Sequence, residues 1–469
     1  MLNKNVETPS IPALKKSFRS IDVLALAFGT MIGWGWIMLS GTWAIQGGMF
    51  GAMLAFVVGA ILCIFVGIIY AELTPAIPET GGSVAFSKRA LGSFAALVSG
   101  LATSFAYLGV AAWEGPALVS SLSYILPIPS EGYLWTIQGV DVYLTEVIFV
   151  ITAAAILTGI NIRGTKETAI FQTIATTGII LVGLLFLSGG ILFGNIDNAK
   201  PLFTSTQGFM SVLLVVPAMF VGFDVIPQAT AEMDVPLKKI PKLLIFSIIL
   251  ASMWYVLMIL ATCLSAPEEV RVHGTIPVAD SMAYAFGNPI LGKICIVGAL
   301  CGIVTSWNGF LFGAARCIYS MANTGLLPKF LAKTHSKYQT PYVAISFCGF
   351  VCMAASFLGK GALTWFVNSS SFGTVIMYLM VVLSFIALRI KKPNLPRPYR
   401  IKNAKIIGSL ACLVVGFFVY LYMPTGPSSL SLVEWVLVLG WFAIGIILYF
   451  VYRLRIYSQA QQSKEPLNK

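Results

Sequence analysis

Apolar runs of about 20 residues recur along almost the whole chain, and short polar or basic segments separate them. A helix of that length crosses the hydrocarbon core of a bilayer, which is about 30 Å thick, at a rise of about 1.5 Å per residue. The pattern therefore predicts an all-α polytopic membrane protein with twelve transmembrane helices. The predicted spans are residues 21–46, 50–74, 93–122, 142–160, 168–194, 208–232, 241–264, 290–322, 341–359, 364–389, 405–423 and 432–452.

The segments between these spans are too short to hold a soluble domain. The longest on the predicted outer side are residues 123–141 and 265–289, and the second contains a helical pattern at 278–286 that we expect to cap an outer vestibule. The first span follows a polar segment and has no clear small-residue cleavage site after it. We therefore expect a retained helix and not a signal peptide.

The charged residues predict the orientation of the chain. Of all residues, 58% are hydrophobic and 10% are charged, whereas soluble domains carry about 25% charged residues. With the N-terminus inside, the predicted inner segments hold 25 of the 30 Lys and Arg residues, and the outer segments hold only Lys200, Arg271, Lys293 and Lys360. This asymmetry predicts a multi-pass protein of the inner (cytoplasmic) membrane with both termini cytoplasmic. It also accounts for the net charge of +12 without a nucleic-acid partner.

The sequence offers no catalytic or metal centre. All eight cysteines lie in apolar runs without paired spacing, which argues against disulfides and zinc. His273 and His335 fall in loops on opposite sides of the membrane. We therefore expect neither an enzyme nor a cofactor. One or two polar groups per span do not supply the pore of a channel, and the short loops do not supply the domain of a receptor.

Two spans are interrupted in the middle. The first reads Gly29-Thr30-Met31-Ile32-Gly33-Trp34-Gly35, and the sixth places Gly222 and Asp224 between Pro217 and Pro227. Such residues are tolerated where the freed backbone groups are buried in protein or line a wet cavity. Each of these spans opens one of two five-helix blocks. Paired breaks of this kind indicate a transporter site between inverted repeats.

The chemistry of the breaks follows from their backbone. Unpaired N–H groups in the first span would hold a carboxylate, and freed carbonyl groups in the sixth would accept from an ammonium group. Gly29 and Gly33 alone would also fit a helix-packing face, which is the commoner meaning of GxxxG. The additional Gly35 and the matching break in the sixth span favour a binding site.

Only two acids lie well inside the predicted hydrocarbon region, Glu114 in the third span and Asp224 in the sixth. An ionised carboxylate at that depth costs roughly 2.5–3.5 kcal/mol, so each is expected to face protein or water. For Asp224, beside the break, we favour binding of a substrate amine or a proton over a structural hydrogen bond. Glu114 is expected one turn or more below the pocket, where coupling and structural roles are equally open.

Six short motifs, in order along the chain, resemble the amino acid, polyamine and organocation (APC) superfamily of transporters. They are Gly29 to Gly35; Ala71-Glu72-Leu73 with Pro78-Glu79-Thr80-Gly81-Gly82; Asn161-Ile162-Arg163-Gly164; Phe220 to Asp224 with Glu232 and Pro236; Ala315-Arg316 with Gly325-Leu326-Leu327-Pro328; and Arg397-Pro398-Tyr399-Arg400. The resemblance runs from about Phe18 to Arg400. It implies a LeuT-like fold of five plus five inverted helices, with two more helices appended, that works by alternating access.

The chain is accordingly expected to divide into a transport core and flanking segments. The predicted parts are a cytoplasmic N-terminal tail at 1–19, a ten-helix core at 20–390 with repeats at 20–195 and 207–390, a basic cytoplasmic loop at 391–404, helices eleven and twelve at 405–452, and a cytoplasmic C-terminal tail at 453–469. We expect the basic loop to orient the chain and to meet anionic lipid head groups.

The resemblance also implies a substrate site. The carboxylate cradle falls on Met31, Ile32, Gly33, Trp34 and Gly35, the amine side on Phe220, Gly222 and Asp224, an aromatic gate on Phe310, and the pocket wall on Thr103, Ala106, Tyr107 and Ala111. Two positions depart from the family pattern. Trp34 stands where many relatives have a small polar residue, which removes a hydroxyl contact to the substrate and narrows the cavity. Ile179 stands about where certain proton-coupled relatives have a lysine.

Coupling to an ion is expected, and two ions stay open. Thr305 and Ser306 lie near the place where sodium-coupled members of the fold bind a cation, although such hydroxyls more commonly bond back to their own helix. Protons would bind Glu114 or Asp224.

The expected function is a secondary transporter, either a symporter or an exchanger, of an amino acid. The alternative is a carrier of amines without a carboxylate, such as polyamines or ethanolamine, for which Trp34 and the two buried acids would be the reason. The expected partners are the small-molecule substrate and the lipid bilayer, with the chain acting as a monomer or a homodimer.

Overall fold

The computed structural model describes residues 14–462 and shows an all-α polytopic membrane protein, as predicted. Within this range, nine helices are long and apolar enough to cross a membrane. They are α2 (Gly35–Ala76), α4 (Ser93–Leu122), α5 (Leu144–Arg163), α6 (Thr165–Phe193), α9 (Ile240–Ser265), α12 (Pro289–Asn323), α14 (Leu363–Lys391), α15 (Ala404–Tyr422) and α16 (Leu432–Gln462).

Three of the predicted spans are built from shorter pieces. The first is divided between α1 (Ser20–Met31) and the beginning of α2, and the sixth between α7 (Thr206–Met219) and α8 (Val225–Gln228). The ninth is α13 (Tyr342–Ala355), which continues as the 3-10 helix η5 (Ser356–Leu358). Every predicted span overlaps one or two of these helices, and the count of twelve stays a prediction.

Helix α2 covers the end of the first predicted span and the whole of the second because it turns sharply at Gly48 (φ 73°, ψ 166°). A Cβ atom at this position would lie 2.7 Å from the carbonyl oxygens of Pro201 and Leu202. Only glycine combines that dihedral with so close an approach of another backbone. The turn falls between residues 46 and 50, where the sequence predicts a loop.

Short elements fill the segments between the long helices. The helical pattern predicted at 278–286 is confirmed as α11 (Pro277–Phe286), which follows α10 (Glu268–His273). The antiparallel hairpin of β1 (Tyr133–Ile137) and β2 (Val140–Tyr143) was not predicted. The remaining elements are α3 (Ser83–Leu91) and the 3-10 helices η1 (Ile196–Ala199), η2 (Thr230–Glu232), η3 (Leu237–Lys239), η4 (Lys329–Ala332) and η6 (Lys360–Ala362).

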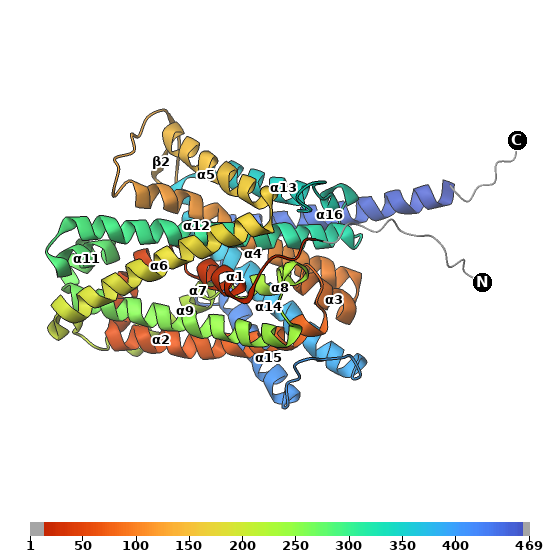
Figure 1. The fold of residues 1–469 in the computed structure, drawn as a ribbon, viewed down its shortest axis with the longest axis horizontal. Coiled ribbons are helices and arrows are strands. Elements are labelled where there is room, and N and C mark those ends of the chain that lie inside the picture. The colour runs from red at the N-terminus through yellow and green to blue at the C-terminus, as the bar shows by residue number, and fades with distance from the viewer. Residues whose placement is uncertain (1–13, 463–469) are drawn as a thin grey trace, which may run out of the picture.

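The long helices run side by side along the long axis of the molecule, and the short helices α1, α7 and α8 lie among them near the middle (Figure 1). Helix α2 packs extensively against α9 and α7, while α4 packs against α12 and α14. The broken spans are therefore enclosed by continuous ones, which bury the backbone groups that the breaks release.

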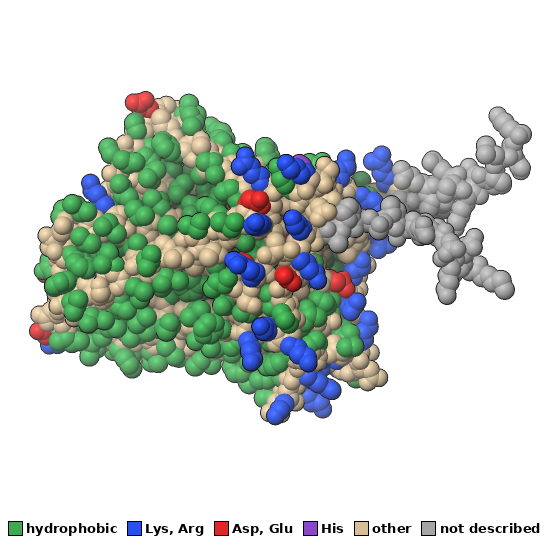
Figure 2. All heavy atoms as spheres, in the orientation of Figure 1, with side chains coloured by type: hydrophobic (Ala, Val, Ile, Leu, Met, Phe, Trp, Pro, Cys, Tyr) green, Lys and Arg blue, Asp and Glu red, His purple; other side chains and the backbone are tan. Residues whose placement is uncertain are grey.

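The outer surface of the molecule is largely apolar, as in a protein embedded in a bilayer. Hydrophobic side chains cover most of the face in Figure 2, and Lys and Arg gather toward the end at which α16 ends. Large apolar side chains such as Ile174 (68% exposed), Leu192 (70%) and Phe350 (67%) point outward. An apolar surface of this extent is stable only in a bilayer.

Candidate functional site

The first helix break lies where the sequence predicts it. Helix α1 ends at Met31, Ile32 leaves the helical conformation (φ −98°, ψ 69°), and α2 begins at Gly35. The hydroxyl of Tyr255 donates to the carbonyl oxygen of Met31 at 2.9 Å and so binds one of the released acceptors. The first N–H groups of α2 have no acceptor within their own helix, and they form a partially positive end there.

The second break is confirmed as well, and it touches the first. Helix α7 ends at Met219 and α8 begins only at Val225. Between them Gly222 has a φ of 135°, and a Cβ atom on it would lie 2.8 Å from the Met31 nitrogen and 3.0 Å from the Thr30 carbonyl carbon. Glycine is needed at 222 because the two interrupted backbones approach each other at this point.

A small cavity of about 20 Å³ lies beside this contact. Its wall consists of Thr30, Met31, Gly33, Trp34, Gly35, Val110, Trp113, Glu114, Ala218, Met219, Val221, Tyr255, Ser306 and Phe310. A cavity of this size holds about one water molecule. The conformation is therefore closed around the site, and binding of an amino acid requires the wall to move.

Two indole rings form part of the wall. The centroids of Trp34 and Trp113 are 5.7 Å apart, with the rings tilted by 57°. Met219 packs against Gly35, because a Cβ atom on Gly35 would lie 2.6 Å from the Met219 sulfur. The expected narrowing of the cavity by Trp34 therefore has a geometric basis.

Glu114 lies in the cavity wall, which corrects the expectation that it sits a turn or more below the pocket. A Cβ atom on Gly33 would be 2.5 Å from Glu114 Oε1 and 2.7 Å from Ser306 Oγ. The carboxylate is fully buried, and neither oxygen accepts a hydrogen bond of ordinary geometry from the described residues. It is the one charged side chain among those that line the cavity.

Asp224 lies behind the cavity wall and not in it. Its carboxylate accepts from the hydroxyl of Tyr107, from the hydroxyl of Tyr378 at 3.4 Å and from the Gly222 N–H at 2.9 Å. These bonds tie the break in the sixth span to α4 and α14. The ring of Tyr107 also contacts Phe310, with centroids 5.4 Å apart. Asp224 therefore does not reach the cavity in this conformation. It can do so only after its hydrogen bonds to Tyr107 and Tyr378 break.

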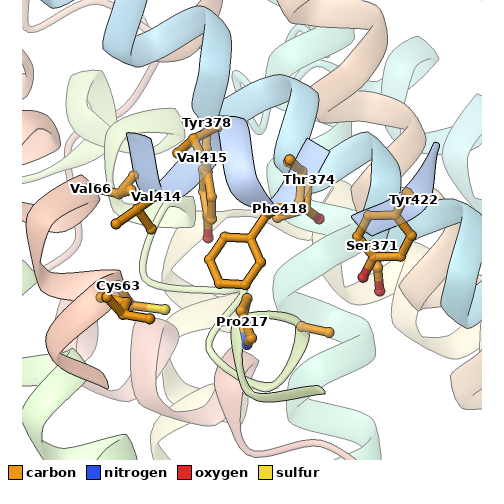
Figure 3. Close-up of a pocket in the computed structure, with 13 residues that line it drawn as sticks. Cys63, Val66, Pro217, Ser371, Thr374, Tyr378, Val414, Val415, Phe418 and Tyr422 are labelled. Atoms are coloured by element: carbon orange, nitrogen blue, oxygen red, sulfur yellow. The ribbon is translucent and has the colours of Figure 1, made fainter. Parts of the chain in front are cut away.

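Tyr378 borders another small cavity, between α2, α7, α14 and α15 (Figure 3). Cys63, Val415 and Phe418 form part of its wall, and no charged side chain lines it. A zwitterionic substrate would find no partner for either charge there. This cavity is therefore not a candidate for the substrate site.

The other residues predicted for the pocket are buried but do not line the cavity. Thr103 exchanges a hydrogen bond of 2.8 Å with Ser83, and Phe220 packs against Tyr255 with ring centroids 6.1 Å apart. The side chains of Ile32, Ala106 and Ala111 are fully buried.

Several wall residues escaped sequence reasoning. Val110 lies one helical turn before Glu114, so the period of 3.6 residues could have identified it. Trp113 adjoins Glu114 in the sequence. Thr30, Ala218, Met219 and Val221 adjoin predicted positions in the two breaks. Tyr255 carries no signal, because it is one of several aromatic residues in an apolar span.

An amide network occupies the region where a sodium ion was considered. Thr305 Oγ1 donates back to the carbonyl oxygens of Cys301 and Gly302, both at 2.9 Å. Gln172 Nε2 donates to the Thr305 carbonyl at 3.1 Å, and Asn308 donates to Gln172 Oε1 at 2.8 Å. The Thr305 carbonyl and Gln172 Oε1 thus each accept from a neutral amide, while the Thr305 hydroxyl donates back to its own helix.

The side chains of α6 that face α1 at this depth are also polar amides and hydroxyls. A Cβ atom on Gly29 would lie 2.5 Å from Thr176 Oγ1 and 2.8 Å from Gln172 Nε2. Ile179 is fully buried farther along the same helix. No basic side chain of α6 therefore contacts Gly29.

Two buried ion pairs join motifs that are far apart in the sequence. Arg316 donates to both carboxylate oxygens of Glu232, at 2.8 and 3.0 Å, and both side chains are fully buried or nearly so. Thr165 adds a bond of 2.7 Å to the same carboxylate. The N–H groups of Ser17 and Phe18 donate to the Glu232 carbonyl at 2.9 and 3.2 Å. The segment before α1 is thereby tied to the end of the sixth span.

The second pair places one basic residue of the loop inside the protein, whereas Lys391, Lys392, Arg400 and Lys402 are exposed. Arg397 is only 2% exposed, and its Nε lies 2.9 Å from Glu72 Oε1. Arg389 pairs with the other oxygen of the same carboxylate. Arg397 therefore holds the loop against α2 and does not meet lipid head groups.

Comparison with known proteins agrees with this architecture. A family model described as amino acid permease matches residues 18–451. The branched-chain amino acid permease BcaP of Bacillus subtilis is 30% identical, over 94% of this chain and 93% of the relative. The methylthioribose transporter of the same organism is 26% identical, over 94% of both chains. Its aspartate-proton symporter is 25% identical, over 87% of this chain and 79% of the relative.

Proposed function

The chain belongs to the amino acid permease family, and from that premise we propose that it carries an amino acid across the membrane by alternating access. The observation that carries the proposal is the contact of two helix breaks at Gly222, beside a cavity whose wall includes Thr30, Met31, Gly33, Trp34 and Gly35. A site between two interrupted helices can open to either side when the half-helices move separately.

The broken backbone suits the carboxylate of an amino acid. The N-terminal end of α2 begins at Gly35, in the cavity wall, and its free N–H groups favour an anion. The ammonium group would lie toward the freed carbonyls of residues 219–224 or toward Glu114. Trp34 and Trp113 would have to separate to admit the substrate, because the closed cavity holds about one water molecule.

We further propose that transport is coupled to protons at Glu114. A zwitterion adds no net charge, so a bound zwitterion beside an ionised Glu114 would leave one uncompensated negative charge in the membrane. Such a charge costs roughly 2.5–3.5 kcal/mol. A proton on Glu114 removes it. The amide donors that occupy the Thr305 carbonyl and Gln172 Oε1 argue against sodium in this role.

The second candidate is a carrier of organic amines that lack a carboxylate. The same lone carboxylate favours it, because a monovalent amine would neutralise Glu114 without a proton, and the two indole rings could stack against a cation. The two candidate functions differ in whether a proton crosses the membrane with the substrate. An amino acid would enter with a proton, whereas an amine would carry its own charge.

Purified protein in sealed vesicles tests the proposal. Leucine is the first probe because one relative is a branched-chain amino acid permease, followed by aspartate, serine and the matching amines. We expect saturable counterflow of an amino acid, accumulation driven by a proton gradient, and no change when sodium is replaced by choline.

Two variants and one competition experiment separate the parts of the proposal. Glu114→Gln should retain counterflow but lose proton-driven accumulation, while Glu131→Gln, in an exposed outer segment, should behave as the wild type. Competition by a decarboxylated amine as strong as by its amino acid would favour the second candidate. Absence of counterflow for the whole panel would refute both.

A further inference from the structure

A larger hollow lies away from the helix breaks, where α4, α12, α13 and α16 meet. We name it the lateral crevice, and its volume is about 450 Å³. Buried Leu101 and Ile318 form its floor, and the partly exposed side chains of Phe347, Phe350 and Leu448 form its walls. No charged side chain lines the crevice.

The crevice is a fixed feature and not a loose gap between helices. At its floor Trp441 Nε1 donates to the Leu101 carbonyl at 3.1 Å. One turn farther along α16, a Cβ atom on Gly445 would lie 2.3 Å from the Leu101 side chain. Helix α16 is thus pinned to α4, and α13 lies alongside it in Figure 1. The space between α13 and α16 stays open because each is held by the inner helices.

Basic side chains border one end of the crevice. Lys329 and Lys333 flank the lining residues Phe330 and Leu331, and both lysines are exposed. The segments 324–342 and 443–456 contain no acidic residue. This border lies at the end of the molecule where Lys and Arg gather in Figure 2.

The apolar lining and the basic border of the crevice match a ligand with an apolar chain and an anionic head group. An apolar crevice that opens sideways from a transmembrane bundle is filled by hydrocarbon in a bilayer, and positive charges at its end select a negative head group. A second copy of this chain fits less well, because its matching end would bring the same positive charges together.

We propose that the lateral crevice binds one anionic phospholipid, with an acyl chain between α13 and α16 and its phosphate beside Lys329 and Lys333. The lipid connects α13 with α16, two helices that contact each other little except through the inner helices. It is a binding site separate from the substrate cavity, and the proposal does not depend on which substrate is carried.

Native mass spectrometry of the full chain in detergent tests the proposal, with dioleoyl phosphatidylglycerol and dioleoyl phosphatidylcholine as the competing probes. We expect the wild type to retain one phosphatidylglycerol in preference to phosphatidylcholine. K329E/K333E should lower this preference about tenfold or more, since each basic residue contributes attraction to an anionic head group. S346W, which fills the crevice from an exposed lining position, should lower the retention of both lipids.

Two matched variants serve as controls. K402E/K405E makes the same charge change at two exposed positions around the start of α15, and A354W adds the same ring at an exposed position of α13 that does not line the crevice. Both should bind as the wild type does. The proposal is overturned if the wild type does not distinguish the two lipids, if the controls lose as much binding as the test variants, or if the crevice variants alter dimer formation and not lipid retention. K329E/K333E decides alone if S346W does not fold.

Discussion

Replacing Gly222 by alanine perturbs the contact between the two helix breaks directly. The residue has a φ of 135°, which an L side chain adopts only under strain, and strain of this kind costs of order 1–3 kcal/mol. The added Cβ would also lie 2.8 Å from the Met31 nitrogen and 3.0 Å from the Thr30 carbonyl carbon. Both neighbours are backbone atoms, so neither can rotate away and the two breaks must separate.

A penalty of about 2 kcal/mol lowers the population of the closed arrangement about 30-fold relative to conformations in which the breaks are apart. We expect Gly222→Ala to insert into the membrane but to lose at least about tenfold in the rate of counterflow, together with several degrees of thermal stability in detergent. Counterflow of labelled leucine, or of the amino acid that replaces it from the panel, measures the first effect.

Gly440→Ala is the matched control, because it lies in α16 and a Cβ there would meet no atom within 4 Å. It should transport at the wild-type rate. Wild-type transport and stability in Gly222→Ala would refute the reasoning, since the contact between the breaks would then carry no weight in the closed state.

The remaining predictions concern the neighbouring residues. Gly33→Leu would force a side chain into Glu114, because even a Cβ atom at this position would lie 2.5 Å from Glu114 Oε1. We expect no uptake by this variant although an immunoblot should detect the protein in the membrane. Asp224→Asn keeps an acceptor for Tyr107 but removes the charge, so we expect counterflow to fall at least about tenfold while the melting temperature changes little. Arg316→Met would leave Glu232 buried without its partner, at a cost of about 3–5 kcal/mol. Its melting temperature should fall sharply, and the second substitution Glu232→Gln should restore part of it.

The interruptions of the helices could be predicted because they contradict their surroundings. Gly33, Gly35 and Gly222 weaken a continuous transmembrane helix, so their presence at matching depths in two spans indicates the breaks. The contact between the breaks could not be predicted, since the φ of Gly222 and its approach to Met31 depend on how two distant segments pack.

The depth of side chains on different helices is the property that the sequence predicts least well. The position of Glu114 along its span is known from the sequence, but the height of that span relative to the first break is not, and packing of α4 brings Glu114 into the cavity wall. The bond between Gln172 and Asn308 escaped for a related reason. Each is a lone polar residue in an apolar run, and only the fold brings the two amides together.

The pairing of motif residues was also invisible in the sequence. Glu72 and Arg397 lie 325 positions apart by their numbers, yet they form one buried ion pair. The hairpin was missed for a simpler reason. Its turn at Gln138 and Gly139 has positive φ at both residues, 52° and 73°, but the pair is a weaker turn signal than Asn-Gly or Asp-Gly.

A structure determined with the transported amino acid bound tests the central claim most directly. The account predicts substrate density between the ends of α1 and α7, with the carboxylate on the N–H groups that begin α2 and with Trp34 moved away from Trp113. Density elsewhere in the molecule, with the two breaks still in contact at Gly222 and no ligand between them, would contradict it.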